Sequence, residues 1–288
     1  MQTYHDCIPC FMKQALNAAR LATSDTGVHE HVLRRVLADT AAHDLNQPPP
    51  VMGQRIHQII REATGSSDPY NTVKKQYNEF GLELYPQLKQ TIAQSPNPLE
   101  TAIRLSIAGN IIDFGVAESI NQAEVASVIE KSLAQTLAGD VSAFQAAMAS
   151  ARNILFLGDN AGEIVFDRLL IETLERDHIT YVVRGGPVIN DVTRADAEFT
   201  GITEIVDVMD NGSDAPGTIL SQCSQSFQRA FNDADLVVAK GQGNFESLSD
   251  ADQHIFFIFK VKCPVVAAHT DCPAGSMMIH EKRSDKNW

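Results

Sequence analysis

The chain has 288 residues, of which 44% are hydrophobic and 20% charged, which is enough to bury the core of one large or two modest domains. Its formal net charge of -13 argues against a nucleic-acid partner, because such binding depends mainly on Lys and Arg. The opening MQTYHDCIPC lacks the features of a signal peptide, and no apolar run is as long as a membrane span. We therefore expect a cytoplasmic protein with no membrane partner. The five cysteines, an odd number, do not indicate a disulfide framework.

Residues 1–150 are expected to form an all-helical region. Apolar residues recur there at spacings of three and four, as in Ile56-Ile59-Ile60, which is typical of amphipathic helices that pack on one another. Proline-rich segments, such as Pro48-Pro49-Pro50 and Ser95-Pro96-Asn97-Pro98, separate these stretches. Such segments are expected where helices begin or end.

A C-x-x-C pair, Cys7 and Cys10, precedes a helix that we expect to begin near Phe11. Thioredoxin chemistry would need a strand ahead of the pair, and the sequence upstream supplies none. A structural zinc site would need two further ligands. We therefore favour a structural role for the pair over metal binding, and metal binding over redox chemistry. The candidates for further zinc ligands are His5, Cys263, His269 and Cys272.

Asn110 and Asp113 interrupt an apolar stretch, Ile103 to Val116, that is expected to be helical. They are three residues apart and therefore share one face of a helix. Buried polar groups need partners, so both residues are candidates for a substrate pocket. The alternative is a helix end near Gly109 or Gly115.

After residue 150 the sequence alternates between short apolar runs and helix-length segments. This pattern is typical of a parallel sheet covered by helices on both faces. We therefore expect an α/β protein in which a helical N-terminal region precedes a Rossmann-like, three-layer α/β/α domain over residues 151–288, with a mostly parallel sheet. The expected strands are Ile154–Leu157, Tyr181–Val183, Ile205–Val208, Leu236–Val238 and Val265–Ala268.

Polar residues and glycines follow the first four of these runs. In an open α/β sheet, ligands bind outside the carboxyl ends of the strands, so these side chains should meet at one rim. Helix caps and turns account for each residue singly, but not for a lysine directly behind an apolar run or for two aspartates that share one crevice. The residues are Asp159 and Asn160 after the first run, Arg184 and Asp191 after the second, Asp210 and Ser213 after the third, and Lys240 and Asn244 after the fourth.

The candidate ligands in these segments are all oxygen donors. Two carboxylates and an amide carbonyl suit Mg²⁺ or Mn²⁺, whereas zinc would prefer His and Cys. Such an ion leaves coordination positions for a substrate phosphate, which Gly-rich turns and Lys240 would also hold. The pattern therefore indicates phosphoryl chemistry. The sequence has neither the G-x-G-x-x-G fingerprint of dinucleotide sites nor a P-loop, which disfavours a nucleotide-dependent enzyme.

The motifs GDNAGE, VRGGPVINDVT, KGQGNFESL and KCPV, together with HDCIPC, DPY and AGNIIDFG, resemble the domain of unknown function 89 family of damage-control phosphatases. The paired cysteines resemble those of its prokaryotic branch. The resemblance covers nearly the whole chain, with one departure from the family's motifs at His269–Met278. It implies a divalent cation, Mg²⁺ or Mn²⁺ with Co²⁺ or Ni²⁺ as in vitro substitutes, on Asp159, Asn160 and Asp191. It also implies that Lys240 binds the substrate phosphate.

We therefore expect a metal-dependent phosphomonoesterase that acts on small phosphorylated metabolites, such as sugar phosphates or phosphopantetheine-like compounds. Asp159 and Lys240 are the expected catalytic residues. The sequence does not distinguish attack on the phosphoryl group by water from attack by an aspartate nucleophile. The alternatives are a metabolite-binding or redox-sensing module that uses Cys7 and Cys10, and a nucleotide-dependent transferase on the same type of sheet. The expected substrate contacts are Arg184, Lys240, Asn244, Asn110, Asp113, Asp210 and Ser213.

Overall fold

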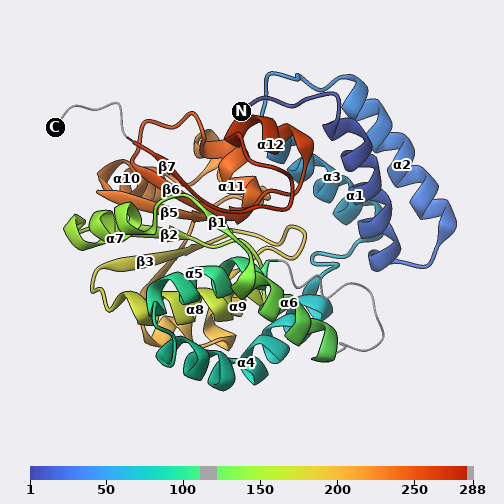
Figure 1. Cartoon of the computed structure of the whole chain (residues 1–288). Coiled ribbons are helices and arrows are strands. Elements are labelled where there is room, and N and C mark those ends of the chain that lie inside the picture. Colours follow the sequence, from blue (N-terminus) through green and yellow to red (C-terminus); the bar gives the residue numbers. More distant parts are fainter. Residues whose placement is uncertain (111–121, 284–288) are drawn as a thin grey trace.

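The computed structural model describes residues 1–110 and 122–283. Within these ranges seven strands form one sheet in the order β1-β7-β6-β5-β2-β3-β4. All neighbouring strands are parallel except β6 and β7, so β1 and β7 run opposite to the other five strands. Helices cover both faces of the sheet, and α1 to α3 lie beside it (Figure 1). The expected α/β class, with a helical N-terminal region and a mostly parallel sheet, is confirmed. None of the described helices combines the length and hydropathy that a membrane span needs.

The strands agree with the expected runs in four cases out of five. β2, β3 and β5 contain the expected residues, and β4 begins two residues later than expected. The expected strand Val265–Ala268 is wrong, because Pro264 opens helix α12 there and its fixed φ favours the first turn of a helix. The strands are β1 Leu137–Ala138, β2 Ile154–Leu157, β3 Ile179–Val183, β4 Asp207–Asp210, β5 Leu236–Lys240, β6 Ile255–Lys260 and β7 Met277–Lys282.

Two helices of the N-terminal part begin at the proline-rich segments, as predicted. Pro49 and Pro98 occupy the first positions of α3 and α5, and Asp25 caps α2. The helices are α1 Cys7–Ala22, α2 Thr26–Ala41, α3 Pro49–Thr64, α4 Asn71–Ala93, α5 Pro98–Gly109, α6 Gln122–Ala134, α7 Val141–Ser150, α8 Glu163–Leu174, α9 Arg194–Phe199, α10 Gln225–Asp233, α11 Gly241–Leu248 and α12 Pro264–Thr270.

The two faces of the sheet have separate cores. Successive residues of β2 alternate between them, with Phe156 in the core under α4, α5, α7 and α8, and Leu155 in the core under α10 to α12. Helices from before residue 150 therefore share a core with the sheet. We expected residues 1–150 to be all helical, and this is not entirely so, because β1 lies among them. A two-residue strand carries too little pattern to be recognised in a sequence. The division at residue 150 itself stays a prediction.

Helix α3 packs on the loops that follow β3 and β4. A Cβ at Gly53 would lie 2.8 Å from Cγ of Pro216, so the helix and the loop are in close contact there. Arg61 donates to the carbonyl of Pro187 at 3.0 Å and forms an ion pair with Asp214. The helices α1 to α3, which share their own core, are thereby attached next to the carboxyl edge of the sheet.

Candidate active site

The loops after β2 and β3 bring the three expected metal ligands together. Asn160 and Asp191 pair as an isolated antiparallel bridge. The backbone N–H of Val192 donates to the carbonyl of Asp159 at 2.9 Å, and that of Ala161 donates to the carbonyl of Asn190 at 2.8 Å. The two loops are joined because β2 and β3 are parallel neighbours whose carboxyl ends share one edge.

Two hydrogen bonds from the amide nitrogen of Asn160 fix the orientation of its side chain. Its Nδ2 donates to Oδ2 of Asp159 at 2.8 Å and to Oε2 of Glu163 at 3.0 Å. Asn110 also donates from Nδ2 to Oδ2 of Asp159, at 2.6 Å. These bonds leave the carbonyl Oδ1 of Asn160 and the second oxygen, Oδ1, of Asp159 as the groups available to a cation.

The carboxyl group of Asp191 is buried beside another acid. The pKa of Asp191 is raised to about 7, mainly by burial and in addition by Asp159. Arg184, whose Nε donates to Oδ2 of Asp191 at 2.7 Å, acts in the opposite direction. Desolvation and like-charge repulsion both disfavour the ionised carboxylate. A cation between Asp159 and Asp191 would offset both effects.

The donor set fits a magnesium-type ion. Within the described ranges no three His, Cys, Asp or Glu side chains come together as a metal site, so a cation here would take an amide as its third protein ligand. Mg²⁺ and Mn²⁺ suit such a set, since they prefer oxygen and retain water or substrate ligands. Gly241 adds a second observation. It has a φ of +78°, and a Cβ there would lie 2.0 Å from Oδ2 of Asp159, so only glycine lets the start of α11 approach this carboxylate.

Lys240 does not lie where the sequence suggested. We expected its ammonium group at the same rim as Asp159 and Asp191, facing the substrate. Instead the side chain is fully buried, and Nζ donates to Glu163 Oε1 at 2.7 Å and to Asp167 Oδ1 at 2.5 Å. Burial lowers the pKa of Lys240, but Asp167 and Glu163 outweigh it and the pKa ends above its ordinary value. The lysine is bound to the beginning of α8, where Glu163 also accepts from Nδ2 of Asn160. Its role as a phosphate ligand stays a prediction.

Arg184 and Asn244 are also buried, and a hydrogen bond joins their side chains. NH1 of Arg184 donates to Oδ1 of Asn244 at 3.3 Å, and Nδ2 of Asn244 donates to the carbonyl of Lys240 at 2.8 Å. NH2 of Arg184 lies 3.9 Å from Oδ1 of Asp159 and is a buried group with no hydrogen-bond partner among the described residues. Arg184 therefore keeps a donor on the side of the acidic crevice, whereas Asn244 supports it.

The remaining expected substrate contacts differ in position. Asp210 is exposed and accepts from the N–H of Gly212 at 3.0 Å, and Ser213 is buried and accepts from the N–H of Ala215 at 3.2 Å, so both stabilise turns. Their contact with substrate stays a prediction. Asn110 caps the C-terminus of α5, as the alternative interpretation expected, and it also contacts Asp159. Its contact with substrate stays a prediction. Asp113 lies outside the described residues.

Lys262 is a site residue that we did not single out from the sequence. Its Nζ donates to Oδ1 of Asn110, the same side chain that donates to Asp159, and its own side chain is exposed. Lys262 follows β6 by two residues. Had the run Ile255–Lys260 been recognised as a strand, the rule that ligands bind at carboxyl ends would have pointed to it.

Helix α1 begins at Cys7, and not near Phe11 as expected. Pro9 is tolerated there because the first turn of a helix has no N–H bonds to lose. Both cysteines are free thiols, and burial raises the pKa of Cys7. His269 is engaged by Tyr4, whose hydroxyl lies 3.0 Å from its Nε2, and the described residues assemble no group of three zinc ligands. A structural role for Cys7 and Cys10 stays a prediction.

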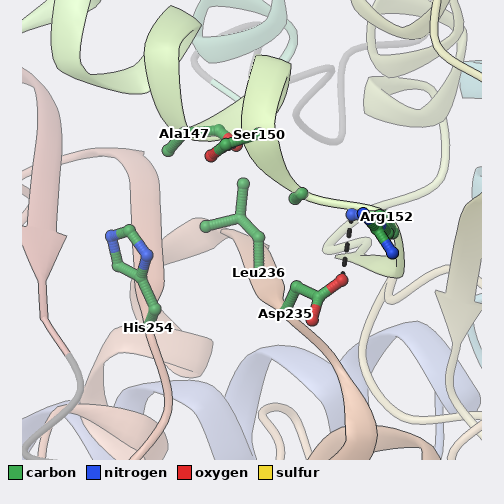
Figure 2. A pocket seen from close by; sticks show the side chains of 7 residues that line it. Ala147, Ser150, Arg152, Asp235, Leu236 and His254 are labelled. Carbon is green, nitrogen blue, oxygen red and sulfur yellow. Dashed lines mark hydrogen bonds between the residues drawn. The ribbon is translucent and has the colours of Figure 1, made fainter. Parts of the chain in front are cut away.

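A pocket at the opposite edge of the sheet is not part of this site. Figure 2 shows it at the amino ends of β2 and β5, lined by Arg152, Asp235 and His254 among others. Oδ2 of Asp235 accepts from the backbone N–H of Arg152 at 2.9 Å. The pocket lies at the end of β5 opposite to Lys240, because Leu236 begins that strand and Lys240 ends it.

A mostly parallel sheet with carboxylates and amides at the carboxyl edge of its strands defines a Rossmann-like α/β protein with a candidate cation site. The family model of the damage-control phosphatase ARMT1-like domain matches residues 3–278. The chain belongs to this family of damage-control phosphatases, which confirms the resemblance found in the sequence. The finer assignment to a branch with an N-terminal C-x-x-C stays a prediction.

Several similar proteins come from archaea. Damage-control phosphatase PH1575 from Pyrococcus horikoshii is 32% identical over 96% of this chain and 97% of its own length. A damage-control phosphatase from Archaeoglobus fulgidus is 32% identical over 94% of this chain and 96% of its own. The crystal structure of the domain of unknown function 89 protein from P. horikoshii has a TM-score of 0.90 at 30% identity, and covers 98% of this chain and 100% of that chain.

Proposed function

We propose that this chain is a metal-dependent phosphomonoesterase that hydrolyses small phosphorylated metabolites, sugar phosphates and phosphopantetheine-like compounds being the first classes to test. The observation that carries the proposal is the joining of Asp159, Asn160 and Asp191 across two paired loops at the carboxyl edge of the sheet. Membership of a phosphatase family supports the same reaction. The cation would be Mg²⁺ or Mn²⁺, as the oxygen donors suggest.

The carboxylates of Asp159 and Asp191 and the amide oxygen of Asn160 would hold the cation. When bound, the cation supplies Lewis-acid polarisation of the phosphoryl group. Arg184 holds Asp191 through Nε, at 2.7 Å. Its NH2 group, which has no hydrogen-bond partner among the described residues, would donate to a phosphoryl oxygen. Lys262 would add a second positive charge at the exposed rim, the position that we first expected Lys240 to occupy.

A panel of phosphate esters tests this function. We expect the purified protein to release inorganic phosphate from one or more small esters in the presence of Mn²⁺ or Mg²⁺, and to lose this activity in excess chelator. Restoration by added metal is the control for damage by the chelator. No release from any ester with Mg²⁺, Mn²⁺, Co²⁺ or Ni²⁺, or release that chelator leaves unchanged, would contradict the proposal.

Replacing Lys262 by alanine should lower kcat/KM about tenfold. A charge-assisted contact to phosphate contributes about 1.5–3 kcal/mol, and the lower end applies here because the lysine is exposed, which corresponds to about tenfold in rate. The unfolding midpoint should stay unchanged. Lys89→Ala is the matched control, since Lys89 is an exposed lysine that pairs with Glu172 at 2.7 Å, near the C-terminal end of α8. Equal effects of the two substitutions on kcat/KM would remove Lys262 from the site.

A further inference from the structure

Helix α4 lies directly on the beginning of α8. The N–H of Gly162 donates to Oδ1 of Asn78 at 2.7 Å. One turn further along α4, a Cβ at Gly81 would lie 3.2 Å from the carbonyl oxygen of Gly162, so the helix and the loop are in close contact there. Gly162 follows Asn160 by two residues. The contact therefore holds the loop after β2 at the point where it enters α8.

The other end of the same amide holds the loop after β3. Nδ2 of Asn78 donates to Oδ1 of Asp196 at 2.9 Å. Oδ2 of Asp196 accepts from the N–H of Thr193 at 2.8 Å and from its hydroxyl at 2.6 Å, which closes the capping box of α9. Thr193 follows Asp191 by two residues. Asn78 thus connects to both loops just beyond their candidate cation ligands.

We propose that Asn78 is a positioning residue that sets the spacing between Asp191 and the pair Asp159 and Asn160. This inference rests on the proposed function, in which these three residues bind the cation. An amide suits the position because it accepts from one loop and donates to the other at the same time. The side chain is 1% exposed, so neither bond is shared with solvent.

The geometry of a cation site depends on the residues behind its ligands, because they orient the ligands before the ion binds. The backbone bonds between Ala161 and Asn190 and between Val192 and Asp159 join the two loops near the ligands. Asn78 joins them a second time, from α4. Loss of this second connection should let the loops separate and weaken the backbone bonds as well as the binding of metal.

The test compares Asn78→Leu, which conserves volume but removes both hydrogen bonds, with Gln253→Leu. Gln253 is a matched control because it is a buried amide that donates to the carbonyls of Phe231 and Asn232, at 2.6 and 2.9 Å, and it precedes β6 at the edge of the sheet opposite to the site. Amide hydrogen exchange is measured on the metal-free proteins, and Mn²⁺ affinity is measured by calorimetry. Asn78→Ala is used if the leucine variant does not fold.

We expect exchange at the N–H groups of Ala161 and Val192 to be faster in Asn78→Leu than in the wild type and in Gln253→Leu. Mn²⁺ affinity should fall by about 10- to 100-fold, the range typical of residues that orient metal ligands. Unchanged exchange at these two amides, or wild-type Mn²⁺ affinity in the variant, overturns the inference. Failure of the wild type to bind any divalent cation would instead overturn the proposed function, and the exchange measurement would still decide the role of Asn78.

Discussion

Asp159→Asn should lower kcat for phosphate release by at least about a thousandfold, the scale of losses when a central catalytic group is removed. The substitution keeps the volume of the side chain but removes its negative charge and one oxygen. Oδ2 of Asp159 accepts from Asn110 and Asn160 at 2.6 and 2.8 Å, and a single amide oxygen cannot serve both donors and a cation equally well. Steady-state phosphate release and calorimetric Mn²⁺ titration measure the two effects.

Asp235→Asn is the control for this substitution. At the opposite edge of the sheet, Asp235 accepts from the backbone N–H of Arg152 at 2.9 Å (Figure 2). It also accepts from the backbone N–H of Asn153 at 2.9 Å. We expect normal turnover in Asp235→Asn and a folded but inactive Asp159→Asn with weaker Mn²⁺ binding. Substantial turnover of Asp159→Asn in the presence of metal would show that the cation site has been placed on the wrong residues.

Lys240→Met should destabilise the protein by about 3–5 kcal/mol, the typical cost of removing one partner from a buried ion pair. The lysine lies between two buried carboxylates, at 2.7 Å from Glu163 and 2.5 Å from Asp167, and methionine has a similar length but no charge. Burial raises the pKa of Glu163 to about 7 even with Lys240 in place. Loss of the lysine ammonium group should therefore favour the protonated forms of Glu163 and Asp167 over their ionised forms. Urea unfolding at pH 7 measures the change in the free energy of unfolding.

A compensating variant separates this explanation from phosphate binding. Lys240→Met combined with Glu163→Gln and Asp167→Asn leaves no unpaired buried charge, and it should recover part of the lost stability. Asp167 also accepts from Ser106 at 2.7 Å and from Tyr181 at 3.0 Å, which an asparagine oxygen can partly preserve. If Lys240→Met unfolded at the wild-type midpoint and only kcat/KM fell, the lysine would instead be the phosphate ligand that the family resemblance implies.

The sequence by itself was sufficient to predict the central strands and the acids that follow them. A continuous apolar run such as Ile154–Leu157 is buried on both sides wherever it lies, and the residue after a parallel strand must emerge at the carboxyl edge. Asp159 and Asn160 follow β2 closely and were expected from these two rules, whereas Asp191 lies eight residues after β3 and was named as a ligand by the family resemblance. The glycines beside them, such as Gly241, were expected near the site for the same reason, although only the structure shows that a carboxylate fills the space.

The direction of each polar side chain was decided by the tertiary structure. Lys240 ends a buried strand, and the sequence does not say whether its ammonium continues outward or turns back to Glu163 and Asp167 on α8. Lys262 was missed because β6, the strand that it follows, was not recognised in the sequence. A short helix that begins at Pro264 and the antiparallel strand β7 come after β6, so the regular alternation of parallel strands and long helices ends there.

Long-range partners are hidden from the sequence for a related reason. Asn78 and Asp196 are 118 positions apart, and each is an ordinary polar residue within helical sequence. The local periodicity of a sequence indicates which face of a helix or strand is buried, but it does not indicate which other element packs on that face. The packing of α4 on α8 and α9 decides that one amide joins the two loops of the candidate site, and that packing exists only in the folded chain.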